Sequence, residues 1–227
     1  MGAEPPGSEP GVAHRTEAPR RSRQTPAQRR TQLKRKQRRR TYVIAAIVGV
    51  LLIGAIVAQR VSSNRSSAAF AKLASAAGCG EVRSTGTSGS GQHLRPGETT
   101  TYDTSPPTHG KHAASPLAAG VYEEPLSDDP GKDQNIFRAV HSLEHGAIIV
   151  WYDKLSDDQL DALDRHLRSE RKVLVVPYPP LKGGTHIALT AWGKLVDCER
   201  PSNAFIDEFI ERYRESPDAP EPKALLS

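Results

Sequence analysis

Four of the histidines in this chain fall in two short clusters whose spacing suits metal binding. The clusters are His109-Gly110-Lys111-His112 and His141-Ser142-Leu143-Glu144-His145. Side chains at positions i, i+3 and i+4 of a helix share one face. The imidazoles of His141 and His145 can therefore converge on one ion, with Glu144 as a further ligand, an orienting partner or a base. The alternative is a buried hydrogen-bond network that links the first cluster to the second.

The two clusters belong to different kinds of local structure. Two prolines and a glycine predict a loop around the first cluster, whereas residues 135–145 have the periodicity of a helix that ends at Gly146. The apolar residues of this helix, Ile136, Val140 and Leu143, share one face. The two histidines and the glutamate share another face, about a third of a turn away. The loop is therefore expected to meet a polar helix face.

The second cluster also matches the letters H-x-x-E-H of inverted zinc peptidases. Those enzymes need a third acidic ligand downstream and a larger domain, and here an apolar strand follows at once. The sequence has neither a Gly-rich phosphate loop after a strand nor a nucleophile elbow. No residue is therefore assigned a catalytic role, and a metal-dependent hydrolase is the less favoured reading. The remaining histidines, which are isolated and receive no site, are His14, His93, His166 and His186.

The elements around the clusters predict an α/β fold. Residues 147–152 and 173–176 are apolar runs typical of buried strands. A capping box at Ser156 opens a helix between them, so we expect a right-handed crossover and a parallel pair. A third strand is expected at 186–192 and a last helix after Ser202. The prediction is one small domain with a short mixed sheet and flanking helices.

An uninterrupted apolar stretch, TYVIAAIVGVLLIGAIVA, occupies residues 41–58 between Arg40 and Arg60. As a helix, eighteen residues span roughly 27 Å, close to the thickness of the bilayer hydrocarbon, so we expect one uncleaved transmembrane helix. Twelve Lys or Arg residues and three Glu residues precede it, a charge of +9; since the whole chain carries +5, residues 41–227 carry −4. Positive flanks stay in the cytoplasm. We expect a single-pass cell-membrane protein with a cytoplasmic N-terminus and an extracytoplasmic C-terminal domain.

Composition divides the chain into five segments. The first is rich in Pro, Gln, Arg and Ser and cannot bury enough apolar surface to become ordered. Its last charges, from Lys34 to Arg40, are expected at anionic membrane headgroups, and nucleic-acid binding is not expected. The expected segments are a disordered basic cytoplasmic tail (1–40), a transmembrane helix (41–58), a stalk and Gly/Ser-rich linker (59–92), a globular α/β domain (93–216) and a loose C-terminal tail (217–227).

The chain contains two cysteines, Cys79 and Cys198. In an oxidising compartment outside the membrane, a disulfide between them is expected. It would close a loop of about 120 residues, worth on the order of 4–5 kcal/mol in the chain-entropy model. The alternative is a pair of buried free thiols.

Three segments of the outer half resemble one known family. They are Tyr102–Tyr122 (YDTSPPTHGKHAASPLAAGVY), Val140–Tyr152 (VHSLEHGAIIVWY) and Thr190–Gly193 (TAWG). Together they resemble the uncharacterised, largely actinobacterial family known as domain of unknown function 3105. The resemblance covers about residues 75–217. It implies a basic tail, one membrane helix and an outer domain, and it brings no established activity.

The family pattern bears on the histidines. The pattern reads PPTSG-x-H in the first cluster and VHxLEHG in the second. Four residues of this chain match it, namely His112, His141, Glu144 and His145, while His109 stands where Ser is usual. The resemblance therefore implies a shared site that includes these four residues, and whether His109 belongs to it stays open.

We therefore expect an extracytoplasmic domain that binds a transition metal through His112, His141, Glu144 and His145. Zinc or copper suits imidazole ligands, and the sole methionine, Met1, leaves no thioether for a Cu(I)-specific site. The alternative is a cell-envelope interaction protein whose histidine network is structural. The expected partner is the membrane, and no protein partner is identified.

Overall fold

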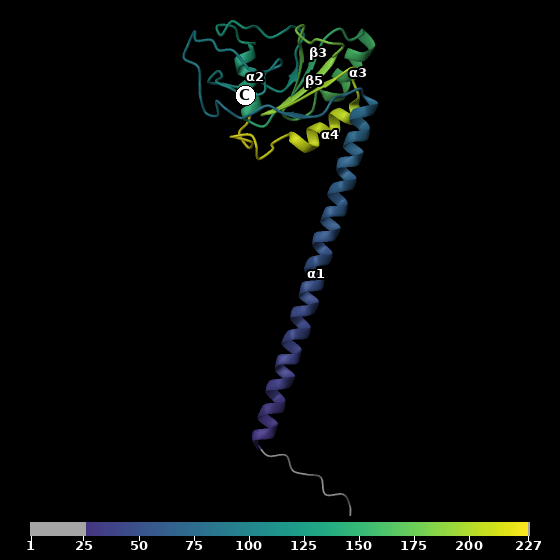
Figure 1. Ribbon diagram of the computed structural model, residues 1–227. Helices are drawn as coiled ribbons and strands as arrows, with labels where there is room; N and C mark the ends of the chain where they lie inside the picture. Colours follow the sequence, from purple (N-terminus) through teal and green to yellow (C-terminus); the bar gives the residue numbers. More distant parts are fainter. Residues whose placement is uncertain (1–25, 227) are drawn as a thin grey trace, which may run out of the picture. The chain divides into compact units, whose positions relative to one another are not determined.

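The computed structural model describes the backbone of residues 26–226, and the side chains of these residues except 26–39, 57 and 61–65 (Figure 1). The chain divides into two compact units, Met1–Val61 and Ser62–Ser227. Helix α1 (Pro26–Ala76) contains the apolar stretch of the first unit. Within it, Arg40–Arg60 has a mean hydropathy of 2.6 and is long and apolar enough to cross a membrane.

Helix α1 begins earlier than the sequence analysis expected. Residues 26–40, assigned there to the disordered tail, are helical, whereas the rest of that tail, residues 1–25, lies outside the described residues. The physical reason for the difference is local, because Gln, Arg, Lys and Ala are good helix formers even where no core is available. Helix α1 also includes residues 60–75, the part of the chain that the sequence analysis assigned to a stalk.

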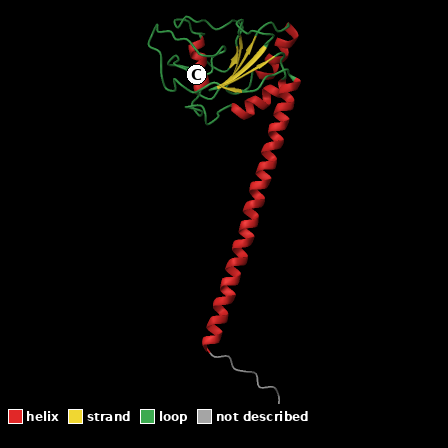
Figure 2. Ribbon diagram, viewed as in Figure 1, coloured by secondary structure: helices red, strands yellow, loops and turns green. Residues whose placement is uncertain are grey.

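The second unit contains a six-stranded mixed sheet flanked by helices, which confirms the expected α/β class (Figure 2). The strand order is β1-β6-β5-β3-β4-β2; β2, β4 and β3 are mutually parallel, and the other neighbours are antiparallel. The strands are β1 (Arg83–Ser84), β2 (Gly120–Val121), β3 (Ile148–Tyr152), β4 (Val173–Pro177), β5 (Ile187–Ala191) and β6 (Lys194–Cys198). The helices are α2 (Ile136–Glu144), α3 (Asp157–Leu167) and α4 (Asn203–Tyr213).

The predicted crossover is present between β3 and β4. The Ser156 side chain accepts a hydrogen bond from the backbone N–H of Gln159, and the Gln159 side chain accepts one from the backbone N–H of Ser156. This capping box starts α3, whose Leu163 and Leu167 are buried against the sheet. Strands β3 and β4 then pair in parallel, with Ile148 opposite Val173.

Alternation along the strands creates two separate cores. One face of the sheet, which we call the helical face, carries Ile148 and Val150 and is covered by α3, α4 and the end of α1. The opposite face, which we call the loop face, carries Ile149 and Trp151 and is covered by α2 and long loops. Figure 1 shows α2 on one side of β3 and β5 and α3 on the other. Both predicted histidine clusters lie on the loop face.

The segment expected as a stalk and linker takes part in the domain. Ala74 and Ala77 belong to the core of the helical face, and β1 is an edge strand of the sheet that pairs with β6. Cys79 forms a disulfide with Cys198 at the end of β6, as predicted. The Gly/Ser/Thr content of this segment indicated turns correctly, but composition carries no signal for a two-residue strand that pairs across the sheet.

Candidate functional site

Helix α2 carries His141 and Glu144 of the second histidine cluster, and both ends of the helix are fixed by local contacts. At the start, the Asn135 side chain accepts a hydrogen bond from Arg138 N at 3.0 Å and caps the helix. At the other end, Gly146 adopts a φ of +76°, and a Cβ there would lie 2.8 Å from the Cα of Glu215. The cap fixes the start of α2, and Gly146 fixes its end, next to the last turn that carries His141 and Glu144.

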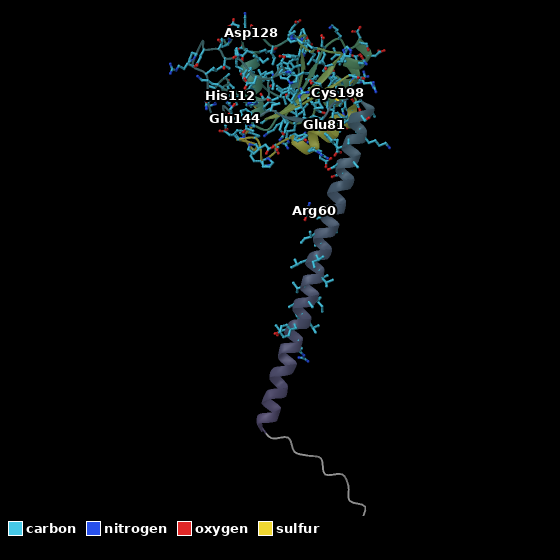
Figure 3. All side chains as sticks on the ribbon, viewed as in Figure 1. Arg60, Glu81, His112, Asp128, Glu144 and Cys198 are labelled. Atoms are coloured by element: carbon cyan, nitrogen blue, oxygen red, sulfur yellow. A yellow bond between two sulfur atoms is a disulfide. The ribbon has the colours of Figure 1, made fainter. Side chains whose placement is uncertain are left out.

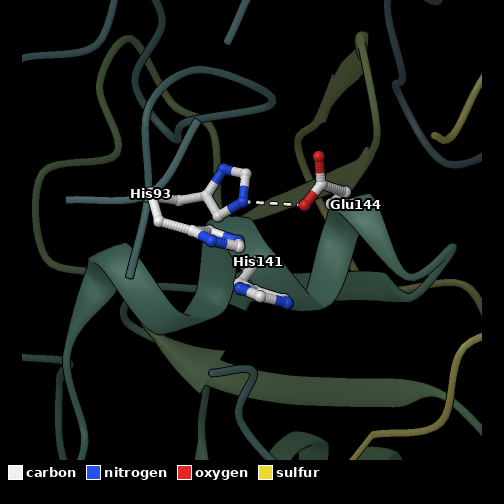
Figure 4. Close-up of side chains that lie close together, drawn as sticks. His93, His141 and Glu144 are labelled. Atoms are coloured by element: carbon white, nitrogen blue, oxygen red, sulfur yellow. Dashed lines mark hydrogen bonds and ion pairs between the residues drawn. The ribbon is translucent and has the colours of Figure 1, made fainter. Parts of the chain in front are cut away.

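An isolated backbone bridge between two loops brings His93 and His112 to this turn. Leu94 N donates to His112 O at 2.7 Å, and His112 N donates to Gln92 O at 3.0 Å. This parallel bridge places His93 beside His112. The exposed ring of His93 stacks on that of His141, with centroids 5.1 Å apart and planes 5° apart (Figure 4). The pairing with the loop is what brings His93, which looked isolated in the sequence, to the cluster.

His112 and Glu144 form a fully buried pair. His112 Nδ1 lies 2.7 Å from Gly110 O, an acceptor, so this nitrogen carries the proton. His112 Nε2 lies 2.8 Å from Glu144 Oε2, the contact drawn as a dashed line in Figure 4. Glu144 Oε1 accepts from Gly91 N at 2.6 Å. Since Nε2 of a neutral His112 and the carboxylate are both acceptors, one proton or one cation must lie between them.

His141 and His145 repeat this arrangement. His141 Nδ1 donates to Ala113 O at 2.6 Å and His145 Nδ1 donates to Leu225 O at 2.8 Å. The two Nε2 atoms then face each other at 2.9 Å. Burial lowers the pKa of His141 to about 4, against the opposing effect of its hydrogen bond to Ala113. His141 is therefore neutral at neutral pH, and its Nε2 is an acceptor that faces His145 Nε2.

Four side chains are close enough to share an ion. One ligand atom from each of them lies within 4.8 Å of every other. In a tetrahedral zinc site with bonds of about 2.0–2.1 Å, ligand atoms are about 3.3 Å apart, so the side chains would have to move closer together to hold one ion. The four residues are His93, His112, His141 and Glu144.

Three of the predicted site residues, His112, His141 and Glu144, thus come together. The fourth, His145, is outside the group of four but touches His141. His109 binds Thr108 Oγ1 through Nδ1 at 2.9 Å and is also outside the group. His166 pairs with Asp207 at 2.7 Å near the surface. Figure 3 labels His112 and Glu144 close together, away from Cys198.

The C-terminal segment completes the last turn of α2. Glu221 N donates to Glu144 O at 3.1 Å, and Glu215 N donates to Gly146 O at 2.9 Å. The buried Lys172 Nζ donates to His145 O at 2.9 Å and to the carbonyl of residue 222 at 2.8 Å. Hydrogen bonds from Arg171 and Lys172 hold the pKa of Glu215 far below its usual value. The described part of the tail that we expected to be loose, residues 217–226, is therefore packed against the site, because it supplies partners for otherwise open helix carbonyls.

A family model described as "Protein of unknown function (DUF3105)" matches residues 93–226. The match covers more than half of the chain, so the chain belongs to this family, as the sequence motifs indicated. Neither a curated protein nor a solved structure matches the chain. The family match does not test the actinobacterial origin, which stays a prediction.

Proposed function

We propose that this member of the DUF3105 family is a membrane-anchored binding module whose extracytoplasmic domain holds one divalent transition-metal ion. The proposed ligands come from the group of His93, His112, His141 and Glu144, and His145 lies within reach of the same ion. The proposal assigns a binding role and no catalytic step. It goes beyond the family description, which names no activity.

One observation carries the proposal. His112 and His141 each donate a hydrogen bond from Nδ1–H to a backbone carbonyl oxygen, with N–O distances of 2.7 Å and 2.6 Å. Such outer hydrogen bonds fix the tautomer of metal-binding histidines and leave Nε2 as the ligand atom. One ring nitrogen of each histidine lies within 4.8 Å of a carboxylate oxygen of Glu144. A purely structural network would gain more by pairing each Nε2 with a donor.

The ligand types indicate zinc or copper. Imidazole nitrogens suit zinc and Cu(II), whereas Mg²⁺ and Ca²⁺ prefer oxygen ligands alone. A thiolate-dependent Cu(I) site is disfavoured because Cys79 and Cys198 are joined in a disulfide, and the sole methionine is Met1. One carboxylate among several imidazoles fits the donor set of a zinc site.

Two features support the proposed location. The apolar helix Arg40–Arg60 follows a strongly basic segment, and positive flanks favour a cytoplasmic N-terminus. The disulfide fits an oxidising compartment. The basic segment is proposed to lie at anionic headgroups instead of on nucleic acid.

An impermeant amine reagent tests this orientation on intact cells. Lys154 and Lys223 have side chains that are 75% and 82% exposed and should be labelled at once. Lys34 and Lys36, which precede the apolar helix, should be labelled only after the membrane is opened. The reverse pattern of labelling would contradict the proposed topology.

Metal binding is tested on the full chain in detergent after treatment with a chelator. We expect one equivalent of zinc or Cu(II) per chain, measured by calorimetry and elemental analysis. His141→Ala should abolish tight binding because it removes the most buried imidazole of the stacked pair. His166→Ala is the matched control, since this histidine pairs with Asp207 near the surface. Absence of stoichiometric metal in the wild-type chain would refute the proposal.

The second candidate is a cell-envelope interaction protein with a structural histidine network. The contacts that favour it are the closed pairs of His112 with Glu144 and His141 with His145. This candidate predicts that His112→Ala lowers the melting temperature while the wild-type chain takes up no metal. The metal titration therefore separates the two candidates.

A further inference from the structure

We infer that the C-terminal segment supplies a metal ligand, the carboxylate of Glu221, which binds the ion together with His141 and His145. This inference rests on the proposed metal-binding function and extends it to a residue far from the histidine motifs. It also gives His145 a direct role.

The contact between His141 and His145 is the first support. Both Nδ1 atoms are committed as donors to carbonyls, of Ala113 and Leu225 respectively. The two Nε2 atoms lie 2.9 Å apart, and since both Nδ1 atoms donate to carbonyls, this contact needs a proton or a metal ion between or beside the two nitrogens. An ion bound to His141 Nε2 is necessarily close to His145 Nε2. The geometry therefore draws His145 into the coordination of the same ion.

The position of Glu221 is the second support. Its Oε2 lies 3.4 Å from His145 Nε2, close to the separation of about 3.3 Å between two ligands of one tetrahedral zinc. The Glu221 backbone is fixed, because its N–H binds Glu144 O. The side chain is 59% exposed, so it can rotate toward an ion without disturbing the core. A carboxylate beside two imidazoles also offsets the charge of a divalent ion.

The wrapping of residues 215–226 around α2 is the third support. Backbone N–H groups of this segment donate hydrogen bonds to the carbonyls of Glu144 and Gly146. The carbonyl of Leu225 accepts a hydrogen bond from His145 Nδ1. Each contact lies within one helical turn of a proposed ligand. A ligand on this segment would therefore join two parts of the chain, the last turn of α2 and residues 219–225, through the ion.

The test compares two variants of the full chain in detergent, with zinc as the probe. Glu221→Gln keeps the shape and the backbone hydrogen bond but removes the charged ligand. Asp218→Asn is the matched control, since Asp218 is 48% exposed on the same segment and pairs with Lys194 instead of a histidine. We expect Glu221→Gln to weaken zinc binding about tenfold or more and Asp218→Asn to leave it unchanged.

A second measurement is hydrogen exchange of the amides at 219–225. Zinc should slow this exchange in the wild-type chain and in Asp218→Asn, and it should have no such effect in Glu221→Gln. Equal zinc affinities of the two variants would overturn the inference and leave the proposed function standing. A wild-type chain that takes up no zinc would instead refute the proposed function itself.

Discussion

The two faces of the sheet carry opposite kinds of interior. On the helical face, α3, α4 and the end of α1 bury side chains such as Phe205, Phe209 and Leu163, and the disulfide adds a covalent link. The loop face buries His112, Glu144 and other polar groups beneath α2 and irregular backbone. An apolar core needs only matched volume, whereas each buried polar atom needs a partner. The difference separates an apolar, covalently linked core on one face from a buried network of polar side chains on the other.

The largest effect is expected from the disulfide of the helical face. Cys198→Ser removes a link between residues 119 apart, which should lower the free energy of unfolding by about 5 kcal/mol in the chain-entropy model. Urea unfolding of the full chain measures this. Zinc affinity of the molecules that remain folded should be unchanged. Two alkylatable thiols in the untreated protein would show that the cysteines are unpaired and would break this part of the comparison.

A slightly smaller effect is expected from truncation within the same core. Phe209 is 0% exposed, so Phe209→Ala should lower the free energy of unfolding by about 3–5 kcal/mol through lost burial and a cavity. The measurement is again urea unfolding, with zinc stoichiometry determined in parallel below the transition. If stoichiometry fell together with stability, the two faces would not be separable.

Acid should act mainly on the loop face. The pKa of His141 is lowered to about 4 by burial, below its value of about 6.5 in an unfolded chain. The unfolded state therefore binds more protons between these values, and stability falls as the pH drops from about 6.5 to about 4. The shift corresponds to on the order of 3 kcal/mol. His141→Gln should remove this part of the pH dependence; the same acid profile in wild type and variant would contradict the assignment.

The smallest effects are expected from the two helix caps. Asn135→Ala at α2 and Ser156→Ala at α3 should each lower stability by about 1 kcal/mol. Only the change at Asn135 should also weaken zinc binding, because α2 carries the ligands and α3 packs on the other face. Calorimetric titration of both variants makes the comparison. Equal zinc affinities would mean that the site tolerates a loosened α2.

Local patterns predicted the regular elements well. The capping box at Ser156 and the apolar runs before and after it specified the β3–α3–β4 unit, because periodicity and caps are properties of contiguous residues. The cluster on α2 was visible for the same reason, since i, i+3 and i+4 spacing places His141, Glu144 and His145 on one face.

Nonlocal pairing was invisible in the sequence. His93 joins the cluster only because residues 92–94 pair with His112, and a single bridge leaves no periodic pattern. The C-terminal segment was predicted to be loose because it contains prolines and few large apolar residues, yet its backbone donates a hydrogen bond to the last carbonyl of α2. Both cases depend on hydrogen bonds between distant backbones, which composition does not encode.

Contacts between segments far apart in the sequence can form only after the later segment has been synthesised. A chain emerges from its N-terminus at about 5–20 residues per second, and Cys198 follows Cys79 by 119 residues. The Cys79 thiol therefore waits roughly 6–24 s for its partner. Residues 215–226, which complete the last turn of α2, arrive later still. The order of emergence makes disulfide closure possible before the histidine cluster is finished, so under the proposed function the metal ion would be bound last in the protein's maturation.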